Sequence, residues 1–237
     1  MRRPRVALSW SSGKDSAWTL HRLRQRAEFE VVGLVTTVNT AFDRVAMHAV
    51  RRELLQRQAQ AAQLPLIEVP LPYPCSNAEY ERLMGGLIEE IKRHGVTHMA
   101  FGDLFLEDIR RYRERQLAGT GITPLFPLWG EPTRALAQGM IEAGLKAVIT
   151  CVDPKQLASD YCGRLFDSSL ISSLPEGVDP CGENGEFHSF AFDGPMFCQR
   201  IEIDVGQTLQ RDGFIFTDLL PRSMAGVTHP VNLVGPE

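Results

Sequence analysis

Six consecutive small and charged residues, Ser11-Ser12-Gly13-Lys14-Asp15-Ser16, follow an apolar run near the N-terminus. In such a loop, exposed backbone N–H groups and the positive end of the next helix form an anion site. Lys14 would add a positive charge, and the Asp15 carboxylate suits Mg²⁺ bound to the same phosphates. A turn in which Ser11 or Ser12 merely caps the helix explains the same residues. The spacing is not that of the common nucleotide-binding loop, so both interpretations stay open.

A second group of charged residues follows the apolar run that ends at Phe101. A helix over 103–114 would carry a stripe of alternating charge on one face, made of Asp103, Glu107, Arg110 and Glu114, with Arg113 on its flank. Such a stripe is usually a solvated helix face. Its place after a strand also makes it a candidate ligand contact, because an Arg guanidinium binds phosphate or carboxylate with paired donors.

A third group, Glu183-Asn184-Gly185-Glu186-Phe187-His188, brings acids, an amide and an imidazole into one turn. Gly182 and Gly185 allow close approach of a ligand or a positive φ angle. A polar surface turn whose glycines only serve the bend is the alternative. A fourth candidate is Thr36, at the carboxyl end of a strand, where ligands of open α/β sheets gather; there the alternative is a solvated loop.

The composition describes a globular chain. It has 237 residues, 43% of them hydrophobic, a net charge of −4 and five cysteines that form no C-x-x-C pair. No apolar run approaches the roughly 18 residues of a membrane span, and we expect a cytoplasmic protein with reduced thiols. Basic residues are mixed with acidic ones, which argues against a broad nucleic-acid surface.

Hydrophobic periodicity predicts alternating strands and helices, hence an α/β fold with a parallel sheet. We expect strands at 6–9, 30–37, 66–69, 97–101 and 146–152, and helices at 14–27, 47–63, 77–95, 103–114 and 131–143. Later strands are predicted at 187–192, 196–205 and 214–220, with a hairpin at Asp193-Gly194. His48 lies just inside the second helix, where a histidine is more often a surface or packing residue than a ligand.

The loop at Ser11–Ser16 resembles the pyrophosphatase loop (PP-loop) of the adenine-nucleotide alpha-hydrolase superfamily, with Ser12 in place of a usual glycine. Three further segments, Gly102–Glu114, Gly121–Gly130 and Asp179–Ser189, resemble motifs of the diphthine-ammonia ligase family within it. The four segments follow the family's order between Val6 and Phe197. The resemblance implies a Rossmann-like (HUP-like) parallel sheet with helices on both faces, plus a smaller α+β C-terminal domain.

From the family we expect an ATP-binding PP-loop domain at 1–127, a substrate or acceptor domain at 128–221 and a flexible tail at 222–237. The family's reaction is ATP-dependent amidation of a carboxylate by ammonia, with release of AMP and pyrophosphate. Its acceptor is diphthine on elongation factor 2, if the source organism makes diphthamide. The implied cofactors are ATP and Mg²⁺.

The resemblance also suggests roles for the candidate residues. Catalysis would fall to Lys14, Asp15, Glu183 and Glu186, with Asp15 also holding the metal and the two glutamates holding ammonium. The nucleotide would contact Ser11, Ser12, Gly13, Lys14, Asp15, Ser16, Thr36, Gly102 and Asp103. The other substrate would contact Glu107, Arg110, Arg113, Asn184 and His188.

Two alternatives share the loop. One is an ATP-dependent tRNA-thiolation enzyme, which the lack of paired cysteines and of a basic surface disfavours. The other is a nucleotide-binding sensor without turnover, which would need neither an ammonia site nor an acceptor pocket.

Overall fold

A computed structural model describes residues 2–41, 44–45 and 50–222. His48 and all but the first residue of the tail predicted at 222–237 lie outside the described residues. Among the described helices, none is long and apolar enough to cross a membrane.

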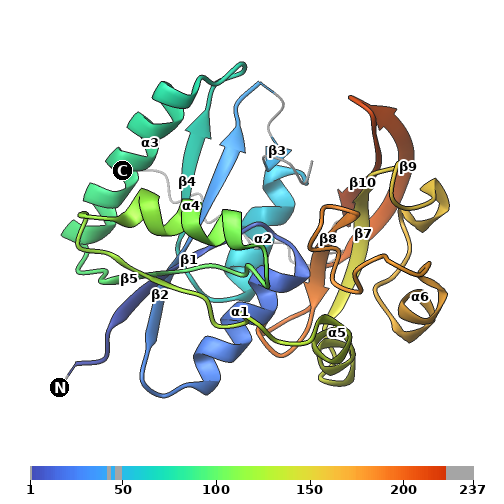
Figure 1. The fold of residues 1–237 in the computed structure, drawn as a ribbon, viewed down its shortest axis with the longest axis horizontal. Coiled ribbons are helices and arrows are strands. Elements are labelled where there is room, and N and C mark those ends of the chain that lie inside the picture. Colours follow the sequence, from blue (N-terminus) through green and yellow to red (C-terminus); the bar gives the residue numbers. More distant parts are fainter. Residues whose placement is uncertain (1, 42–43, 46–49, 223–237) are drawn as a thin grey trace, which may run out of the picture.

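The first half of the chain forms a sheet with five parallel strands in the order β4-β2-β1-β5-β6 (Figure 1). The strands are β1 (Arg5–Ser9), β2 (Glu30–Asn39), β4 (Leu66–Leu71), β5 (His98–Ala100) and β6 (Thr123–Leu125). The two-residue strand β3 (Arg44–Val45) pairs antiparallel with the end of β2. This arrangement confirms the predicted Rossmann-like sheet.

Helices cover both faces of this sheet. They are α1 (Lys14–Gln25), α2 (Arg52–Ala61), α3 (Asn77–Arg93) and α4 (Glu107–Leu117). Val6 and Leu8 of β1 belong to the same hydrophobic cluster as α1 and α2, whereas Ala7 belongs to the cluster of α3 and the end of α4. Successive residues of a strand point to opposite faces, so the two helix pairs lie on opposite sides.

The chain reverses its direction of travel across the sheet between β1 and β5. From β1 it runs outward through β2 to β4, and it then returns past β1 to form β5 and β6. The loops that follow β1 and β5 therefore leave the sheet toward opposite faces. The crevice between them, at the carboxyl ends of the strands, is where open α/β sheets bind ligands.

The second half of the chain forms an antiparallel sheet in the order β8-β7-β10-β9. Its strands are β7 (Lys146–Val152), β8 (Phe187–Asp193), β9 (Ile203–Arg211) and β10 (Phe214–Pro221). Helices α5 (Thr133–Glu142) and α6 (Ser168–Ser173) and the short 3₁₀ turn η1 (Ser159–Tyr161) accompany it. The smaller α+β part of the prediction is confirmed.

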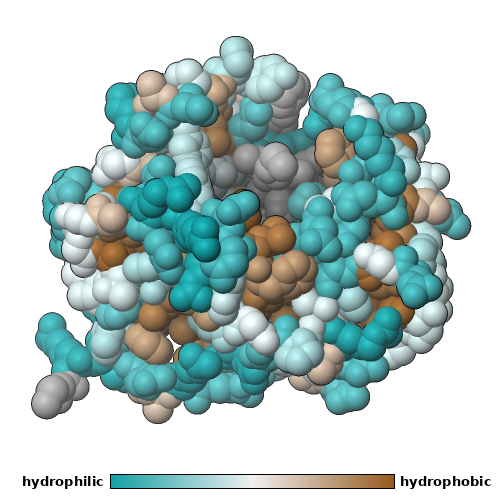
Figure 2. All heavy atoms as spheres, in the orientation of Figure 1, coloured by the Kyte–Doolittle hydropathy of each residue, from teal (hydrophilic) through white to brown (hydrophobic). Residues whose placement is uncertain are grey.

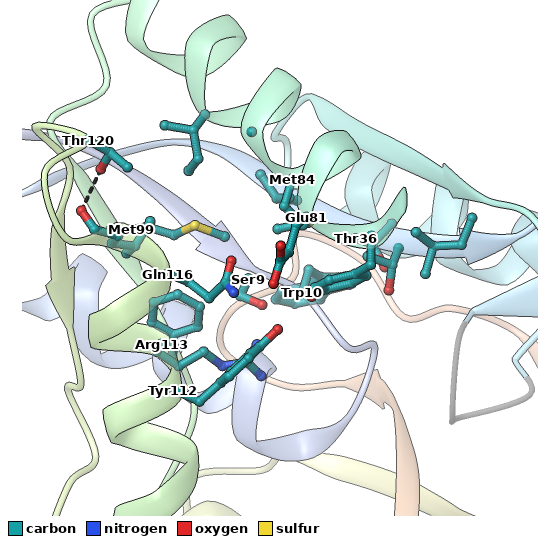
Figure 3. A pocket seen from close by; sticks show the side chains of 18 of the residues that line it. Ser9, Trp10, Thr36, Glu81, Met84, Met99, Tyr112, Arg113, Gln116 and Thr120 are labelled. Carbon is teal, nitrogen blue, oxygen red and sulfur yellow. Dashed lines mark hydrogen bonds between the residues drawn. The ribbon is translucent and has the colours of Figure 1, made fainter. Parts of the chain in front are cut away.

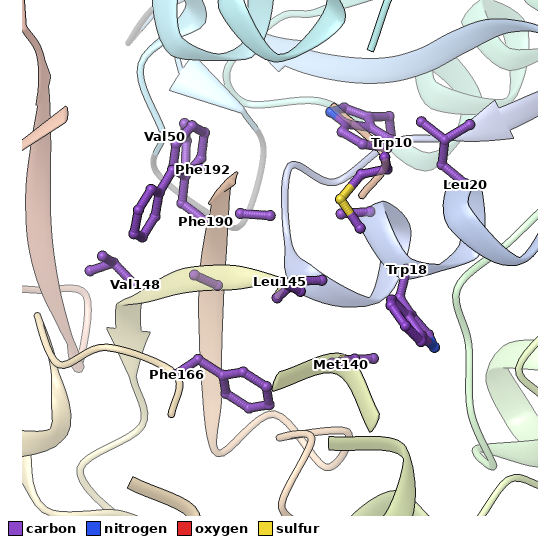
Figure 4. Close-up of a cluster of buried hydrophobic side chains, with 14 of the residues drawn as sticks. Trp10, Trp18, Leu20, Val50, Met140, Leu145, Val148, Phe166, Phe190 and Phe192 are labelled. Carbon is purple, nitrogen blue, oxygen red and sulfur yellow. The ribbon is translucent and has the colours of Figure 1, made fainter. Parts of the chain in front are cut away.

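One hydrophobic cluster joins the two halves. It contains Trp10 and Leu20 from the first half together with Met140 and Phe190 from the second, all 1% exposed or less (Figure 4). On the face shown in Figure 2, hydrophilic residues predominate, and hydrophobic ones gather between the region of α4 and that of β8. Strand β8 lies against the first half near the start of α1, because Ala191 and Ser189 of β8 form hydrogen bonds with the Ser12 carbonyl and the Lys14 N–H.

Three local predictions were wrong. Residues 103–106 are not helical, and α4 begins at Glu107, because the Leu104 N–H donates to the Glu183 carboxylate (2.7 Å). No strand runs from Met196 to Val205: Pro195 lacks an N–H and the chain turns there, so the strand starts at Ile203. The Asp-Gly hairpin joins β9 to β10 at Asp212-Gly213 instead.

Gly102 lets the two loops at the crevice touch. A Cβ atom at this position would lie 3.1 Å from the backbone carbon of Asp15 and 3.2 Å from the Ser16 nitrogen. These are backbone atoms at the start of α1, which cannot turn aside as a flexible side chain can. The end of β5 therefore approaches α1 this closely only because residue 102 has no side chain.

We expect Gly102→Ala to destabilise the protein by about 1–3 kcal/mol, because the added methyl group overpacks a rigid contact. Gly139→Ala is the matched control: Gly139 lies in α5 with nothing within 4 Å of its Cβ position. This control should gain about 0.5–1 kcal/mol from helix propensity. Urea unfolding of both variants measures the difference, and equal stabilities would show that the close approach imposes no constraint.

Candidate functional site

The loop after β1 enters α1 with an unusual backbone conformation. Ser12 has φ 71°, a left-handed value that favours glycine, and its side chain is fully buried. Gly13 occupies the N-cap position without any side-chain cap, so the predicted alternative of a serine capping α1 is not what forms. The Ser16 hydroxyl donates to the Gly13 carbonyl (3.0 Å), and the Ser11 hydroxyl donates to the Ser16 hydroxyl (3.2 Å). The loop is thus held by its own hydroxyl groups.

A buried glutamine of α2 fixes this loop from outside. The side chain of Gln58 is fully buried and accepts from Trp10 Nε1 (2.9 Å). Its Nε2 donates to the carbonyl oxygens of Ser12 (2.9 Å) and Ala191 (2.6 Å). The Ala191 N–H in turn donates to the Ser12 carbonyl (3.0 Å). One amide group therefore connects α2, the loop and β8.

Lys14 lies in a closed position between the two halves. Only 2% of the residue is exposed, and its ammonium group donates to the Cys181 carbonyl and to the Asp15 carboxylate (2.8 Å). The rings of Phe166 and Phe187 lie 5.4 Å from the ammonium nitrogen. The backbone N–H of Lys14 donates to the Ser189 hydroxyl (3.2 Å). The predicted loop and the predicted third group are therefore in direct contact.

These contacts enclose a polar pocket of about 230 Å³. Its walls come from the loop after β1, the end of β5 and the 179–189 segment: Ser9, Ser11, Gly13, Lys14, Asp15, Ser16, Phe101, Gly102, Asp103, Arg113, Cys181, Gly182, Glu183, Gly185, Phe187, His188 and Ser189. We call it the loop pocket. Donors from the loop and several carboxylates face one small space.

The carboxylates of the loop pocket have perturbed acidities. Burial is the main cause that raises the pKa of Glu183 to about 7; the hydrogen bond from the Leu104 N–H opposes this rise, and the charge of Asp15 adds to it. Burial likewise raises the pKa of Asp15 and of Asp103, although Lys14 and Arg113 partly offset the effect. Burial and the Lys14 charge lower the pKa of His188 to about 4, so this imidazole is neutral at pH 7.

The segment 179–186 is a tightly braced turn. Asp179 Oδ2 accepts from the N–H groups of Cys181 (3.1 Å) and Glu183 (3.0 Å). Gly182 has φ 71°, and a Cβ atom there would lie 2.8 Å from the Phe187 carbonyl. Only glycine fits this position, and the turn in consequence presents Glu183 to the pocket.

Glu186 supports this turn from beneath. It is 2% exposed, and its Oε1 accepts from the Asp179 N–H (2.9 Å) and from Asn184 Nδ2 (3.0 Å). Its Oε2 is buried without a hydrogen-bond partner. Neither Glu186 nor Asn184 lines the loop pocket. Their predicted contacts with ammonia and substrate stay predictions, and their observed contacts favour a positioning role.

The two candidate arginines of α4 occupy different environments. Arg113 lines the loop pocket, stacks over Phe101 (5.0 Å) and has its Nε 3.6 Å from Asp103 Oδ2. Both of these facing atoms are buried without a hydrogen-bond partner, so a ligand could engage them. Arg110 instead packs over Phe126 and Trp129 and pairs with Glu114 (2.9 Å), away from the pocket.

A larger cleft of about 600 Å³ opens beside the loop pocket, between α3 and α4 (Figure 3). Its floor contains the carboxyl ends of β1, β2 and β5, including Trp10, Thr36 and Met99. Ser9, Ser11, Phe101 and Arg113 line both the cleft and the loop pocket, so the two spaces adjoin. Thr36 and Arg113 thus face one continuous site, whereas Glu107 lines neither space.

Several residues of this site went unnoticed in the sequence. Gln58 reads as one polar residue in an amphipathic helix, and Ser189 and Asp179 appear only as members of a motif. Tyr112 and Gln116 of the cleft carry no local signal. A polar residue on the apolar face of a predicted helix, as at Gln58, is the one signal that could have been used.

The carboxylates of the loop pocket suit a divalent cation. Asp15, Asp103 and Glu183 offer the hard oxygen ligands that Mg²⁺ prefers, and burial disfavours their ionisation when no cation is near. No group of three metal-binding side chains occurs among residues 2–41, 44–45 and 50–222.

The fold and the site define a Rossmann-like α/β protein in which an acidic turn covers the loop at the start of α1. Comparison with known proteins gives the family. Residues 4–124 match the diphthamide synthase N-terminal domain and residues 132–217 match the diphthamide synthase C-terminal domain. The chain belongs to the diphthamide synthase family, which confirms the resemblance seen in the sequence.

The chain is similar over most of its length to proteins named diphthine–ammonia ligase. It is 29% identical to that of Danio rerio, over 84% of this chain and 86% of the relative. It is 27% identical to that of Homo sapiens, over 86% and 85%, and 25% identical to that of Rattus norvegicus, over 94% and 91%. The relatives are ligases that, by name, join ammonia to diphthine.

We expect Gln58→Leu to destabilise the protein by about 2–4 kcal/mol, because it leaves the buried indole N–H of Trp10 and two carbonyls short of partners. Gln60→Leu, at an exposed position of the same helix, is the control and should change stability by less than about 0.5 kcal/mol. Denaturant unfolding tests the pair. A stable Gln58→Leu protein would mean that this amide does not hold the loop.

Stability should depend on pH through Glu183. Its pKa is about 7 in the folded protein and lower when unfolded, so the folded state binds more protons between those values. The contribution of Glu183 is therefore full below about pH 4.5 and is lost as the pH rises through about 7. Glu183→Gln should remove this loss. The stability of the variant minus that of wild type should therefore be larger at pH 8 than at pH 5.

Unfolding of wild type and Glu183→Gln at both pH values measures the effect. His188, with its lowered pKa, contributes the opposite slope in an overlapping range, but it is present in both proteins and cancels in the comparison. An unchanged difference between the proteins at pH 5 and pH 8 would contradict the assignment.

Proposed function

We propose that this protein is an ATP-dependent amide ligase that adenylates a carboxylate and then aminates it with ammonia, releasing AMP and pyrophosphate. The observation that carries the proposal is the convergence of the Ser11–Ser16 loop and the 179–189 segment on one polar pocket. An anion site and a carboxylate of raised pKa then face the same reacting atoms. The relatives named diphthine–ammonia ligase support this reaction class.

The loop pocket would hold the phosphates of ATP. Backbone N–H groups at the start of α1 and the Lys14 ammonium supply positive potential there. Asp15 would hold Mg²⁺, which would supply positive charge to offset the negative charge of the leaving pyrophosphate. Lys14 and Asp15 now pair with each other, so nucleotide binding replaces that contact with contacts to phosphate.

The adjoining cleft would hold the adenosine. It has an apolar floor with a few polar groups, as nucleoside sites do, and the β2 edge at Thr36 reaches it. Arg113 lies where the two spaces meet, at the position expected for the α-phosphate. Its guanidinium would stabilise the negative charge that develops when the carboxylate attacks the α-phosphorus.

Glu183 is the proposed proton acceptor for the second step. A carboxyl group with a pKa of about 7 can take a proton from ammonium at neutral pH, and ammonia then displaces AMP from the acyl adenylate. The proton passes to the Glu183 carboxylate and the electron pair of the broken bond leaves with AMP. His188 and Asn184 are proposed contacts of the acceptor, with Glu186 holding the turn that carries Glu183.

The proposed division of labour follows the chain. Residues 1–127 would bind ATP and residues 128–221 would cover the phosphates and receive the acceptor. The acceptor would be diphthine on elongation factor 2 if the source organism makes diphthamide, and another carboxylate otherwise. Covering the phosphates also keeps water from the acyl adenylate.

Turnover tests the proposal directly. Incubated with ATP, Mg²⁺, ammonium and a carboxylate acceptor, the protein should produce AMP and pyrophosphate. Lys14→Ala and Asp15→Ala should each lower this activity at least about 100-fold, since each removes charge next to the phosphates. Lys155→Ala, at an exposed position, is the control and should act as wild type.

Glu183→Gln separates the two steps. It keeps the acceptor oxygen for the Leu104 N–H but cannot take a proton, so acyl adenylate should form and amide should not. Release of ADP, or no cleavage of ATP with any acceptor, would contradict the ligase. The first outcome would indicate a kinase-like reaction and the second a nucleotide sensor.

A further inference from the structure

One wall of the cleft has a composition that packing does not explain. Helix α3 turns the stripe Glu81, Gly85 and Glu89 toward the cleft at steps of four residues. Helix α4 faces it with Tyr112 and Gln116 at the same spacing, and Thr120 of the turn that follows the helix also lines the cleft. Figure 3 shows the side chains of Glu81, Tyr112 and Gln116 converging on the space beside Trp10.

Gly85 and Gly86 lie side by side in the middle of α3, where glycine weakens a helix relative to alanine. A Cβ atom at either position would meet nothing within 4 Å, and neither residue has a positive φ. Neither packing nor backbone geometry therefore requires these glycines. Gly85 lines the cleft and Gly86 does not, so a ligand close to the helix backbone would account for Gly85.

Glu81 brings an acceptor to the same wall. A carboxylate has no donor and therefore discriminates between a ligand amino group and a ligand carbonyl. Glu81 and Tyr112 line the same part of the cleft (Figure 3). Burial raises the pKa of Tyr112, with smaller contributions from Tyr80 and the Glu81 charge and an opposing one from Arg113. The Tyr112 hydroxyl consequently stays protonated. Glu81 thus faces the ligand space beside a neutral hydroxyl group.

We propose that Glu81 and Gly85 select the base of the bound nucleotide, Gly85 leaving room for the flat ring and the Glu81 carboxylate accepting from its exocyclic amino group. The proposal rests on the proposed function, since it takes the cleft as the nucleoside part of the ATP site. A 6-amino purine is accepted, whereas a 6-oxo purine brings a carbonyl oxygen against the carboxylate. The cleft volume of about 600 Å³ admits a nucleoside and lies within the range of ligand sites.

Inosine triphosphate is the probe, because it carries a 6-oxo group in place of the 6-amino group of ATP, with a proton on N1. Wild-type protein should bind ATP at least about tenfold more tightly than inosine triphosphate, by titration calorimetry with Mg²⁺. Glu81→Gln supplies both a donor and an acceptor, so it should reduce this preference to about twofold. Glu90→Gln, exposed on the same helix outside the cleft lining, should keep the wild-type preference.

The two glycines give a matched pair. Gly85→Leu should weaken ATP binding about tenfold or more, because its side chain enters the space of the base. Gly86→Leu changes helix propensity in the same way but should bind ATP within about twofold of wild type. Both variants should unfold at a higher temperature than wild type, because leucine favours a helix more than glycine does. A loss of ATP binding in Gly85→Leu could then not be explained by a failure to fold.

A wild type without preference for ATP over inosine triphosphate would overturn the inference. So would a Glu81→Gln variant that keeps the full preference, or a Gly85→Leu variant that binds ATP as wild type does. If wild type binds no purine nucleotide at all, the proposed function fails as well. Nucleotide binding and cleavage without base preference would leave the proposed function standing and remove only the selection by α3.

Discussion

The Ser12 carbonyl is the point on which the rest of the site depends. It accepts two hydrogen bonds, from Gln58 of α2 and from the Ala191 N–H of β8. Both are buried, and a buried amide or carbonyl without a partner is costly, so the three segments are held together. The loop keeps its left-handed residue at Ser12, and β8 keeps its place against the first half of the molecule.

This connection explains why a loop and a turn about 170 residues apart can form one pocket. Strand β8 carries Ser189, which receives the Lys14 N–H, and the turn that leads into β8 carries the Cys181 carbonyl that receives the Lys14 ammonium. Gly102 and Gly182 add the close backbone contacts on either side. The width of the pocket is therefore set by backbone and buried amide groups, which are stiffer than exposed side chains.

The charges of the pocket follow from this enclosure. The buried ammonium group of Lys14 contacts Asp15 directly and interacts with Glu183 at longer range, whereas Asp103 lies beside Arg113. Burial raises the pKa of Asp15, Asp103 and Glu183. The groups that oppose this rise differ: Asp15 contacts the Lys14 ammonium, whereas Glu183 accepts a hydrogen bond from the Leu104 N–H. Carboxyl groups in one pocket thus differ in acidity, as the proposed roles of metal ligand and proton acceptor require.

The sequence by itself determined the fold class and the order of the candidate segments. Strand and helix periodicity in the first half, the loop at Ser11–Ser16 and the turn at 179–189 are local properties, and local patterns report them well. Prediction from the sequence failed where tertiary contacts override the local structural preference. A Leu104 N–H drawn to Glu183 kept 103–106 from being helical, and β6, three residues with a proline at the centre, forms only because β5 lies beside it.

The tertiary structure alone decided which candidates share a site. Arg113 and Arg110 are three residues apart in one helix, yet one faces the ligand space and the other packs on Phe126 and Trp129. Glu183 and Glu186 are likewise three residues apart, and one enters the pocket while the other braces the turn. Residue types and spacing cannot separate such pairs, because the direction of each side chain depends on segments distant in the chain.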